Sequence, residues 1–379
     1  MSSSRKNIII LDVVRAISAL IVFLGHARGN VFVEWGALEE GSKNILTFLL
    51  FFITRLGHEG VIAFFIISGY LVAGNAIDKV SKGEFLLQDF LAARLARIWT
   101  PLIPAILFSW LMSRIIYLPD TSYKDMLINF LGLQSIIGPV FGENAPLWSL
   151  AYEIWFYIVV GLLCLFITTV NKLRCSNTTT NIRLSVISFI LLCSSLLVFS
   201  KLNALYLLIW FFGAGIYFID SIQVSKIVKI GILVLGFISI LCSQATTNSV
   251  SINMWAKGVF SQEFADILVG LSFSLVILGF KNSFISEKMP VNFIRFVIKP
   301  IKVVSLISYS LYITHYTVLI LLKNIVNKKF SSISYDSLVI YGINVFLGLF
   351  VAFMFYWLFE KRTPIVKKFI CKIFYVKFA

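Results

Sequence analysis

Two ionisable residues, Arg15 and His26, lie within one apolar stretch near the N-terminus. They are eleven positions apart, so a helix would place them on one face, separated by about 16 Å along its axis. Histidine titrates near neutral pH and can act as a general base or a nucleophile. A charge in the hydrocarbon core costs at least about 2.5–3.5 kcal/mol, so function is the first explanation to test. A packing role through an ion pair with Asp12, three positions before Arg15, is the alternative.

Two further polar side chains, Glu153 and His315, are expected in the outer third of a helical bundle. Glu153 ends the segment Pro146-Leu147-Trp148-Ser149-Leu150-Ala151-Tyr152-Glu153, which places it about 10 Å below the outer surface. His315 ends the segment Ser308-Tyr309-Ser310-Leu311-Tyr312-Ile313-Thr314-His315 and falls at a similar depth. From their similar depth we predict that His26, Glu153 and His315 gather as an acid/base group. Depth is the only basis for this prediction, because the sequence does not fix the rotation of each helix about its axis.

Arg94 and Arg97 are three positions apart, so both guanidinium groups lie on one side of a helix, at its cytosolic mouth. Each planar fork can hold phosphate oxygens at two points, which suits a polyphosphate ligand. The alternative is ordinary basic flanking of a span, with the side chains reaching toward the headgroups.

Ser68 and Gly69 lie in the middle of another apolar stretch, where small residues favour close helix packing over a nucleophile. No Gly-x-Ser-x-Gly element is present. Ser68 is kept as a candidate for the cofactor-binding set, beside the two arginines. The pair His58 and Glu59, just before this stretch, is interpreted as a solvated loop pair.

These residues are embedded in a chain whose composition indicates a membrane protein. Of its 379 residues 59% are hydrophobic and 13% are charged, and the mean hydropathy is +0.92. A bilayer span needs about 20 apolar residues. We predict an all-α, polytopic transmembrane bundle of about ten helices. The expected helices cover residues 8–27, 60–77, 98–117, 146–168, 184–200, 203–219, 227–243, 263–280, 301–323 and 338–359.

The distribution of charge predicts the topology of this bundle. Lys and Arg are concentrated in the segments that face the cytosol if the N-terminus is inside, which places both termini there. A domain of residues 1–360 would carry the spans, and residues 361–379 would form a basic cytosolic tail. The large outer segments 28–59 and 118–145 are the expected docking place of an external acceptor.

The remaining composition excludes other classes of function. The net charge of +15 is spread between apolar stretches and forms no patch for nucleic acid. The five cysteines show no paired spacing, so neither a disulfide framework nor a metal site is predicted.

Five segments together resemble membrane-bound acyltransferase family 3, the bacterial O-acetyltransferases of surface polysaccharides. They are Leu11-Asp12-Val13-Val14-Arg15 with His26 in an Arg-x10-His spacing, Phe64 to Leu71, Arg94-x-x-Arg97, Trp148 to Glu153, and Ile307 to His315. Each segment is weak alone, but the five occur in the order of the family and span nearly the whole chain.

The resemblance implies that acetyl-CoA is the acyl donor, reached from the cytosol, and that the acceptor is a hydroxyl on the far side of the membrane. The acceptor would be a carbohydrate or lipid-linked glycan such as O-antigen or capsule, and the protein would lie in the bacterial inner membrane. By position, Arg15 and His26 correspond to the catalytic pair, Arg94 and Arg97 to the CoA-phosphate contact, and Glu153 to the family's glutamate.

Several alternatives stay open at the level of sequence. Intramembrane charges also line the paths of transporters and flippases of polysaccharide precursors, although no repeat-related halves are evident here. A structural partner within a polysaccharide-synthesis complex is a third possibility. The sequence does not decide whether His26 is a base or a covalent carrier, which hydroxyl accepts, or how long the acyl chain is.

Overall fold

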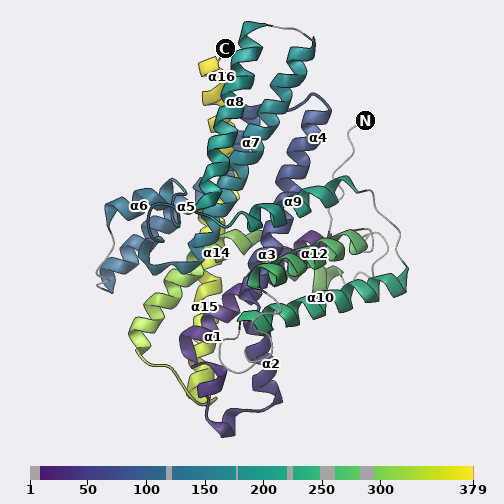
Figure 1. The fold of residues 1–379 in the computed structure, drawn as a ribbon. Helices are drawn as coiled ribbons and strands as arrows, with labels where there is room; N and C mark the ends of the chain where they lie inside the picture. Colours follow the sequence, from purple (N-terminus) through teal and green to yellow (C-terminus); the bar gives the residue numbers. More distant parts are fainter. Residues whose placement is uncertain are drawn as a thin grey trace. The chain divides into compact units, whose positions relative to one another are not determined.

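The computed structural model describes residues 9–116, 122–175, 178–219, 225–247, 261–281 and 294–378, and these are helical nearly throughout. No β-strand occurs among these residues, only two isolated bridges. Figure 1 shows the succession of helices along the chain. The all-α prediction is therefore confirmed.

The chain forms two compact units, each assembled from segments that are far apart in sequence. Unit 1 comprises Met1–Tyr70, Leu208–Tyr309 and Lys329–Tyr341. Unit 2 comprises Leu71–Leu207, Ser310–Lys328 and Gly342–Ala379. Each unit is described by itself below.

Helical segments cover most of every predicted span, and the span 60–77 is divided among three of them. The helices are α1 (Ile9–Val31), α2 (Ile45–Thr54), α3 (Gly57–Ser68), α4 (Asn75–Ser81), α5 (Leu87–Ile115), α6 (Tyr123–Phe130), α7 (Trp148–Cys175), α8 (Thr179–Leu197), α9 (Leu205–Phe218), α10 (Lys226–Thr247), α12 (Gln262–Phe280), α14 (Lys299–Val326), α15 (Tyr335–Leu358) and α16 (Thr363–Phe378). Two π-helical segments, η3 (Gly69–Gly74) and η8 (Ile294–Ile298), precede α4 and α14. The short helical turns η4 (Phe141–Glu143), η5 (Ala145–Leu147) and η9 (Glu360–Arg362) complete the elements used below.

Nine stretches of the described residues are long and apolar enough to cross a membrane. The one remaining predicted span, residues 203–219, corresponds to α9, which is a shorter apolar helix of 14 residues. Another difference concerns α5, which begins at Leu87 although the apolar run begins only at Ile98. Helices are built by backbone hydrogen bonds and extend beyond the apolar stretch, so Arg94 and Arg97 lie inside α5.

Close backbone contacts hold unit 1 together. α3 packs on α1 and on α12, and α12 packs on α10. Where the α3–η3 segment crosses α9, a Cβ at Gly69 would overlap the carbonyl oxygen of Trp210, and one at Gly213 would overlap that of Ile66. This approach confirms that the Ser68–Gly69 segment serves helix packing, as small residues do in membranes.

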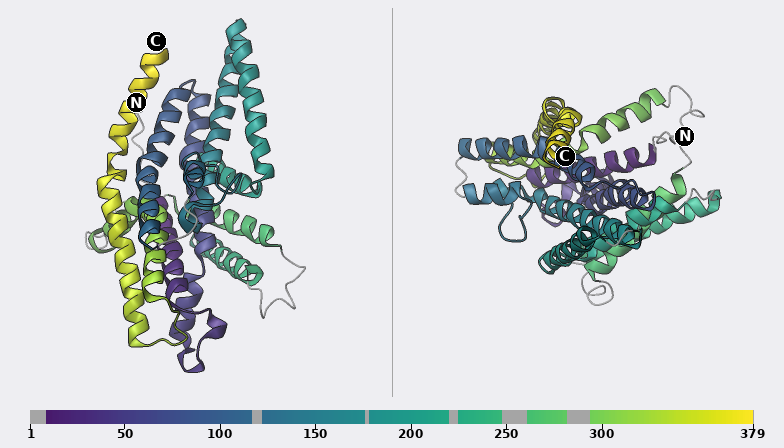
Figure 2. Two further views of the ribbon diagram at one scale, coloured as in Figure 1. Left: turned by 90° about the vertical axis from the view of Figure 1, so that its left-hand side faces the viewer. Right: turned by 90° about the horizontal axis from the view of Figure 1, so that it is seen from above.

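Unit 2 is built around α5 and α7. α7 packs on α8, α5 and α4, and α5 also packs on α6 and α16. Figure 2 shows α7 and α8 side by side and α15 followed by α16 along nearly one line. The side chain of Thr178 accepts a hydrogen bond from the Asn181 amide and caps the start of α8.

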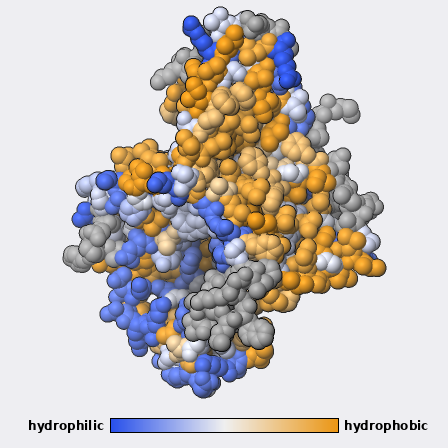
Figure 3. Space-filling view, in the orientation of Figure 1, coloured by the Kyte–Doolittle hydropathy of each residue, from blue (hydrophilic) through white to orange (hydrophobic). Residues whose placement is uncertain are grey.

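Apolar side chains cover much of the molecular surface. In the most apolar 18-residue stretch of the span that contains α10, only 17% is buried inside the protein, and in that of the span that contains α8 only 28%. In Figure 3, apolar side chains dominate the surface over both helices. Such surfaces are stable only against lipid, and helices satisfy their backbone polar groups internally. The chain is therefore a multi-pass membrane protein.

Candidate active site

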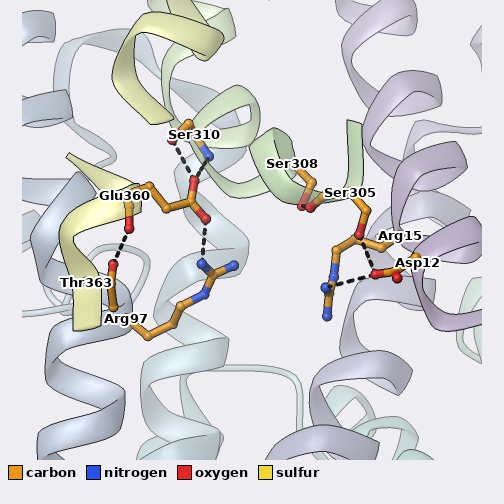
Figure 4. Close-up of polar contacts among 8 residues, drawn as sticks. All are labelled: Asp12, Arg15, Arg97, Ser305, Ser308, Ser310, Glu360 and Thr363. Carbon is orange, nitrogen blue, oxygen red and sulfur yellow. Dashed lines mark hydrogen bonds and ion pairs between the residues drawn. The ribbon is translucent and has the colours of Figure 1, made fainter. Parts of the chain in front are cut away.

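Arg15 of α1 takes part in a polar cluster of unit 1, which we call the Asp12 cluster: Asp12, Arg15 and Ser305. An Nη1 of Arg15 lies 3.9 Å from Oδ1 of Asp12, and the hydroxyl of Ser305 on α14 donates to that same oxygen at 2.9 Å. Figure 4 shows both contacts. The predicted Asp12–Arg15 pair is confirmed, in a loose geometry whose side chains are 29% and 23% exposed.

His26 is half-buried near the end of α1, in a stretch of backbone that its neighbours fix. A Cβ at Gly25 would overlap the backbone carbonyl of Thr54 at the end of α2. The hydroxyl of Tyr341 on α15 reaches the carbonyl of Leu24 at 3.5 Å. The backbone beside His26 is therefore held by two other elements of unit 1, which limits the positions open to the imidazole.

Glu153 belongs to a row of polar side chains on α7 in unit 2. Ser149, Glu153 and Tyr157 are four positions apart and share one face of the helix. The Tyr157 hydroxyl donates to Oε1 of Glu153. At the other end of the row, Oγ of Ser149 lies 2.6 Å from the hydroxyl of Tyr312 on α14. We call Ser149, Glu153 and Tyr157 the α7 row.

His315 lies fully buried in the part of α14 that belongs to unit 2. Its Nδ1 donates to the carbonyl of Leu311 at 2.7 Å. In a neutral imidazole the proton then resides on Nδ1, and Nε2 carries the lone pair. The rings of Tyr312 and Tyr316 each lie 6.2 Å from the imidazole.

Of the three acid/base groups that were predicted to gather, the structure places two in the same unit. Glu153 and His315 belong to unit 2, on two helices that meet at the Ser149–Tyr312 hydrogen bond. His26 belongs to unit 1. Its convergence with the other two stays a prediction.

Asn144, in the turn before α7, is a buried polar residue that the sequence did not single out. Its Nδ2 donates to the carbonyl of Ile313 at 3.0 Å, and Thr317 Oγ1 lies 3.4 Å away. Thr317 in turn lies 2.6 Å from the hydroxyl of Ser109 on α5. A search for charges overlooks these neutral groups, although Asn144 is only two positions before Pro146 of the recognised segment.

Arg97 is bound to a carboxylate in unit 2, in what we call the Glu360 cluster: Arg97, Ser310 and Glu360. Its Nη1 lies 2.5 Å from Oε1 of Glu360. The other oxygen, Oε2, accepts from the backbone amide of Ser310 at 3.1 Å and from its hydroxyl at 2.6 Å. Figure 4 shows Glu360 between these two residues. One nitrogen of the Arg97 fork is therefore engaged within the protein.

Arg94 has different surroundings from Arg97 although both lie on α5. Its guanidinium carbon is 5.5 Å from the ring centre of Tyr157 and 6.0 Å from that of Phe90. Its Nε is buried and has no hydrogen-bond partner within the part of the chain that the structure describes. A buried N–H donor of a cation calls for an acceptor, so this side chain fits an anionic ligand group such as a phosphate.

His58 and Glu59 are not a solvated loop pair, and that interpretation was wrong. His58 Nε2 lies 2.9 Å from Oδ1 of Asp266 on α12. Glu59 is 2% exposed and accepts a hydrogen bond from Gln244 on α10 at 2.8 Å. Partners from other helices thus bind His58 and Oε1 of Glu59, whereas Oε2 of Glu59 is buried without a hydrogen-bond partner among the described residues.

The described residues contain no cluster of three or more His, Cys, Asp or Glu side chains that could hold a metal ion. The polar groups found here suit recognition of an anion and transfer of protons.

Over residues 8–357 the chain matches the family described as acyltransferase domain, and it belongs to that family. The resemblance drawn from the five segments is thereby confirmed. Together with its apolar helices, this makes the protein a membrane acyltransferase. No curated protein and no solved structure matches the chain.

Proposed function

We propose that the protein transfers an acetyl group from cytosolic acetyl-CoA to a hydroxyl of a surface carbohydrate at the outer face of the bacterial inner membrane. Membership of the acyltransferase family supports the class of reaction. The observation that carries the proposal further is the buried, unpaired Nε of Arg94 next to the α7 row, on helices that cross the membrane.

In this proposal the donor is held through its phosphates. Arg94 offers a buried donor with no partner among the described residues, and phosphate oxygens supply the acceptor that it needs. Arg97 lies three positions further along the same helix, and its side chain is 39% exposed, so a phosphate could approach it from solvent. Ser68 stays a weaker candidate for this set, because its segment is engaged in helix packing.

The chemistry assigns an acid/base or nucleophilic role to His26. As a base, His26 takes the proton of the acceptor hydroxyl, whose oxygen attacks the thioester carbonyl. The carbon–sulfur bond breaks, and the CoA thiolate leaves and takes up a proton. As a carrier, His26 itself attacks the thioester, and the hydroxyl then removes the acetyl group from the ring. Arg15, about 16 Å from His26 along the same helix face, would line the path of the thioester arm from the cytosolic side, and Glu153 and His315 would serve as further proton acceptors.

Transfer of radiolabelled acetyl groups from acetyl-CoA, measured in membranes of the native host, tests this function. We expect His26→Ala to lower incorporation into the glycan fraction by about 100-fold or more, since a general base contributes about 10²–10⁴-fold. Cys193→Ala, at an exposed position of α8, is the control, and its labelling should equal that of the wild type if substitution and membrane preparation alone have no effect. Rapid quenching that traps an acetyl-histidine would favour the carrier over the base.

Unchanged labelling by His26→Ala would remove the catalytic assignment. If wild-type membranes transfer no label, a transporter or flippase replaces the enzyme as the explanation of the intramembrane charges. Comparison of glycan masses with and without the gene identifies the acceptor through a loss of acetyl units.

A further inference from the structure

Tyr157 contacts two residues that the proposed function uses, on opposite parts of one side chain. Its hydroxyl donates to Glu153, and its ring lies under the guanidinium of Arg94. The residue is 6% exposed, so both contacts are shielded from solvent. No feature of the sequence singled it out.

The hydroxyl of Tyr157 determines where the Glu153 carboxylate points. A charge-assisted hydrogen bond of this kind is stronger than a neutral one and fixes the acceptor geometry. Tyr157 follows Glu153 by four positions, so one turn of α7 holds donor and acceptor next to each other. Without the donor, one oxygen of Glu153 would lose a partner inside the bundle.

The ring of Tyr157 is one of two aromatic rings that contact the Arg94 guanidinium. A guanidinium within about 6 Å of a ring centre is attracted by the negative face of the ring, and Arg94 is 5.5 Å from Tyr157. Phe90 lies on the same cation at 6.0 Å. A Cβ at Gly161, four positions after Tyr157, would come within 3.0 Å of Phe90, so α7 leaves room for this second ring.

We infer that Tyr157 is a positioning residue that couples donor binding at Arg94 to the chemistry at Glu153. The inference rests on the proposed function, because it takes Arg94 as a contact of the CoA phosphates and Glu153 as an acid/base group. The ring orients Arg94 for the donor, and the hydroxyl orients Glu153 for the acyl-transfer step. The two parts of one side chain thereby serve different steps of the reaction.

Two substitutions separate these parts. Tyr157→Phe keeps the ring and removes the hydroxyl, and Tyr157→Leu removes both. For the full-length protein in detergent, CoA is the probe and its dissociation constant is measured by calorimetry. In host membranes, kcat and KM for acetyl-CoA are measured with the endogenous glycan as acceptor.

For Tyr157→Phe we expect kcat to fall about 10- to 100-fold with the dissociation constant of CoA changed less than twofold, since a hydrogen bond to a charged group is lost. For Tyr157→Leu we expect the same fall in kcat and, in addition, CoA binding weakened about 3- to 30-fold by loss of the cation–π contact. Trp155→Phe is the matched control, because Trp155 also lies on α7 and the substitution removes its hydrogen bond to the carbonyl of Gly132. It should leave both quantities unchanged.

A double variant tests whether the hydroxyl acts through Glu153. Adding Tyr157→Phe to Glu153→Gln should cost little beyond Glu153→Gln alone, whereas independent residues would multiply their losses. The inference is overturned if Tyr157→Phe changes CoA binding as much as kcat, if it changes neither, or if the double variant shows multiplied losses. A wild-type protein that neither binds CoA nor transfers acetyl would instead remove the proposed function itself.

Discussion

Two clusters with the same three kinds of side chain, a carboxylate, an arginine and a serine of α14, are built very differently. In the Asp12 cluster of unit 1 the carboxylate and the guanidinium are 3.9 Å apart. In the Glu360 cluster of unit 2 they are 2.5 Å apart. Asp12 is 29% exposed and Glu360 is 2% exposed.

The hydrogen bonds to each carboxylate deepen this contrast. The backbone amide and the hydroxyl of Ser310 both donate to the Glu360 carboxylate. The backbone carbonyl of Glu360 also accepts a hydrogen bond from the Thr363 hydroxyl at 2.7 Å. Asp12 accepts from the Ser305 hydroxyl. A buried carboxylate is stable only when such donors compensate it. The Glu360 cluster therefore holds helices together, whereas the Asp12 cluster is more loosely paired and more exposed.

The largest effect on stability is expected for Glu360→Ala. The substitution leaves Arg97 without its counter-charge and removes the acceptor of a buried amide, at a cost of about 2–4 kcal/mol. The thermal unfolding midpoint of the purified protein in detergent should fall clearly. Glu40→Ala, which breaks the exposed pair with Lys43, should leave the midpoint unchanged. Equal midpoints for the two variants would contradict a structural role of the Glu360 cluster.

Asp12→Asn sharpens the comparison from the other side. Because the Asp12–Arg15 pair is loose and partly exposed, its loss should cost less than about 1 kcal/mol of stability. Acetyl transfer from labelled acetyl-CoA should nevertheless fall at least about tenfold if Arg15 depends on Asp12 for its orientation. A destabilisation as large as that of Glu360→Ala would show that both clusters are structural.

The two serines allow the clusters to be compared by the loss of a single hydrogen-bond donor. Ser310→Ala removes a hydroxyl donor from a buried carboxylate and should cost about 1.5–3 kcal/mol. Ser305→Ala removes a donor from a partly exposed carboxylate and should cost less than about 1 kcal/mol. Unfolding midpoints measured side by side in one detergent would reveal this order, and a reversed order would refute the comparison.

The sequence predicted well what depends on local spacing. Hydropathy located the helices because a bilayer span must be long and apolar. The spacing of three positions between Asp12 and Arg15 predicted their pairing, since neighbours on one helix face meet whatever the tertiary structure. The same logic, applied at four positions, would have drawn attention to Tyr157 after Glu153.

Long-range partners were beyond this reasoning. His58 and Asp266 are separated by 208 positions, and Gln244 and Glu59 by 185. Arg97 and Glu360 are separated by 263. A charged residue near the end of a span is interpreted as an exposed flanking residue unless its partner on another helix is known. For this reason the sequence revealed neither the ion pair of Glu360 nor the burial of Glu59.

The crossing of the α3–η3 segment with α9 has a consequence for handling the protein. Its two helices touch through backbone atoms at Gly69 and Gly213, with no room for even a methyl group on either side. Contact of this kind draws on dispersion and weak Cα–H···O bonds instead of the expulsion of water. The joint should accordingly persist when the bilayer is exchanged for micelles, and gentle extraction should preserve unit 1 around it.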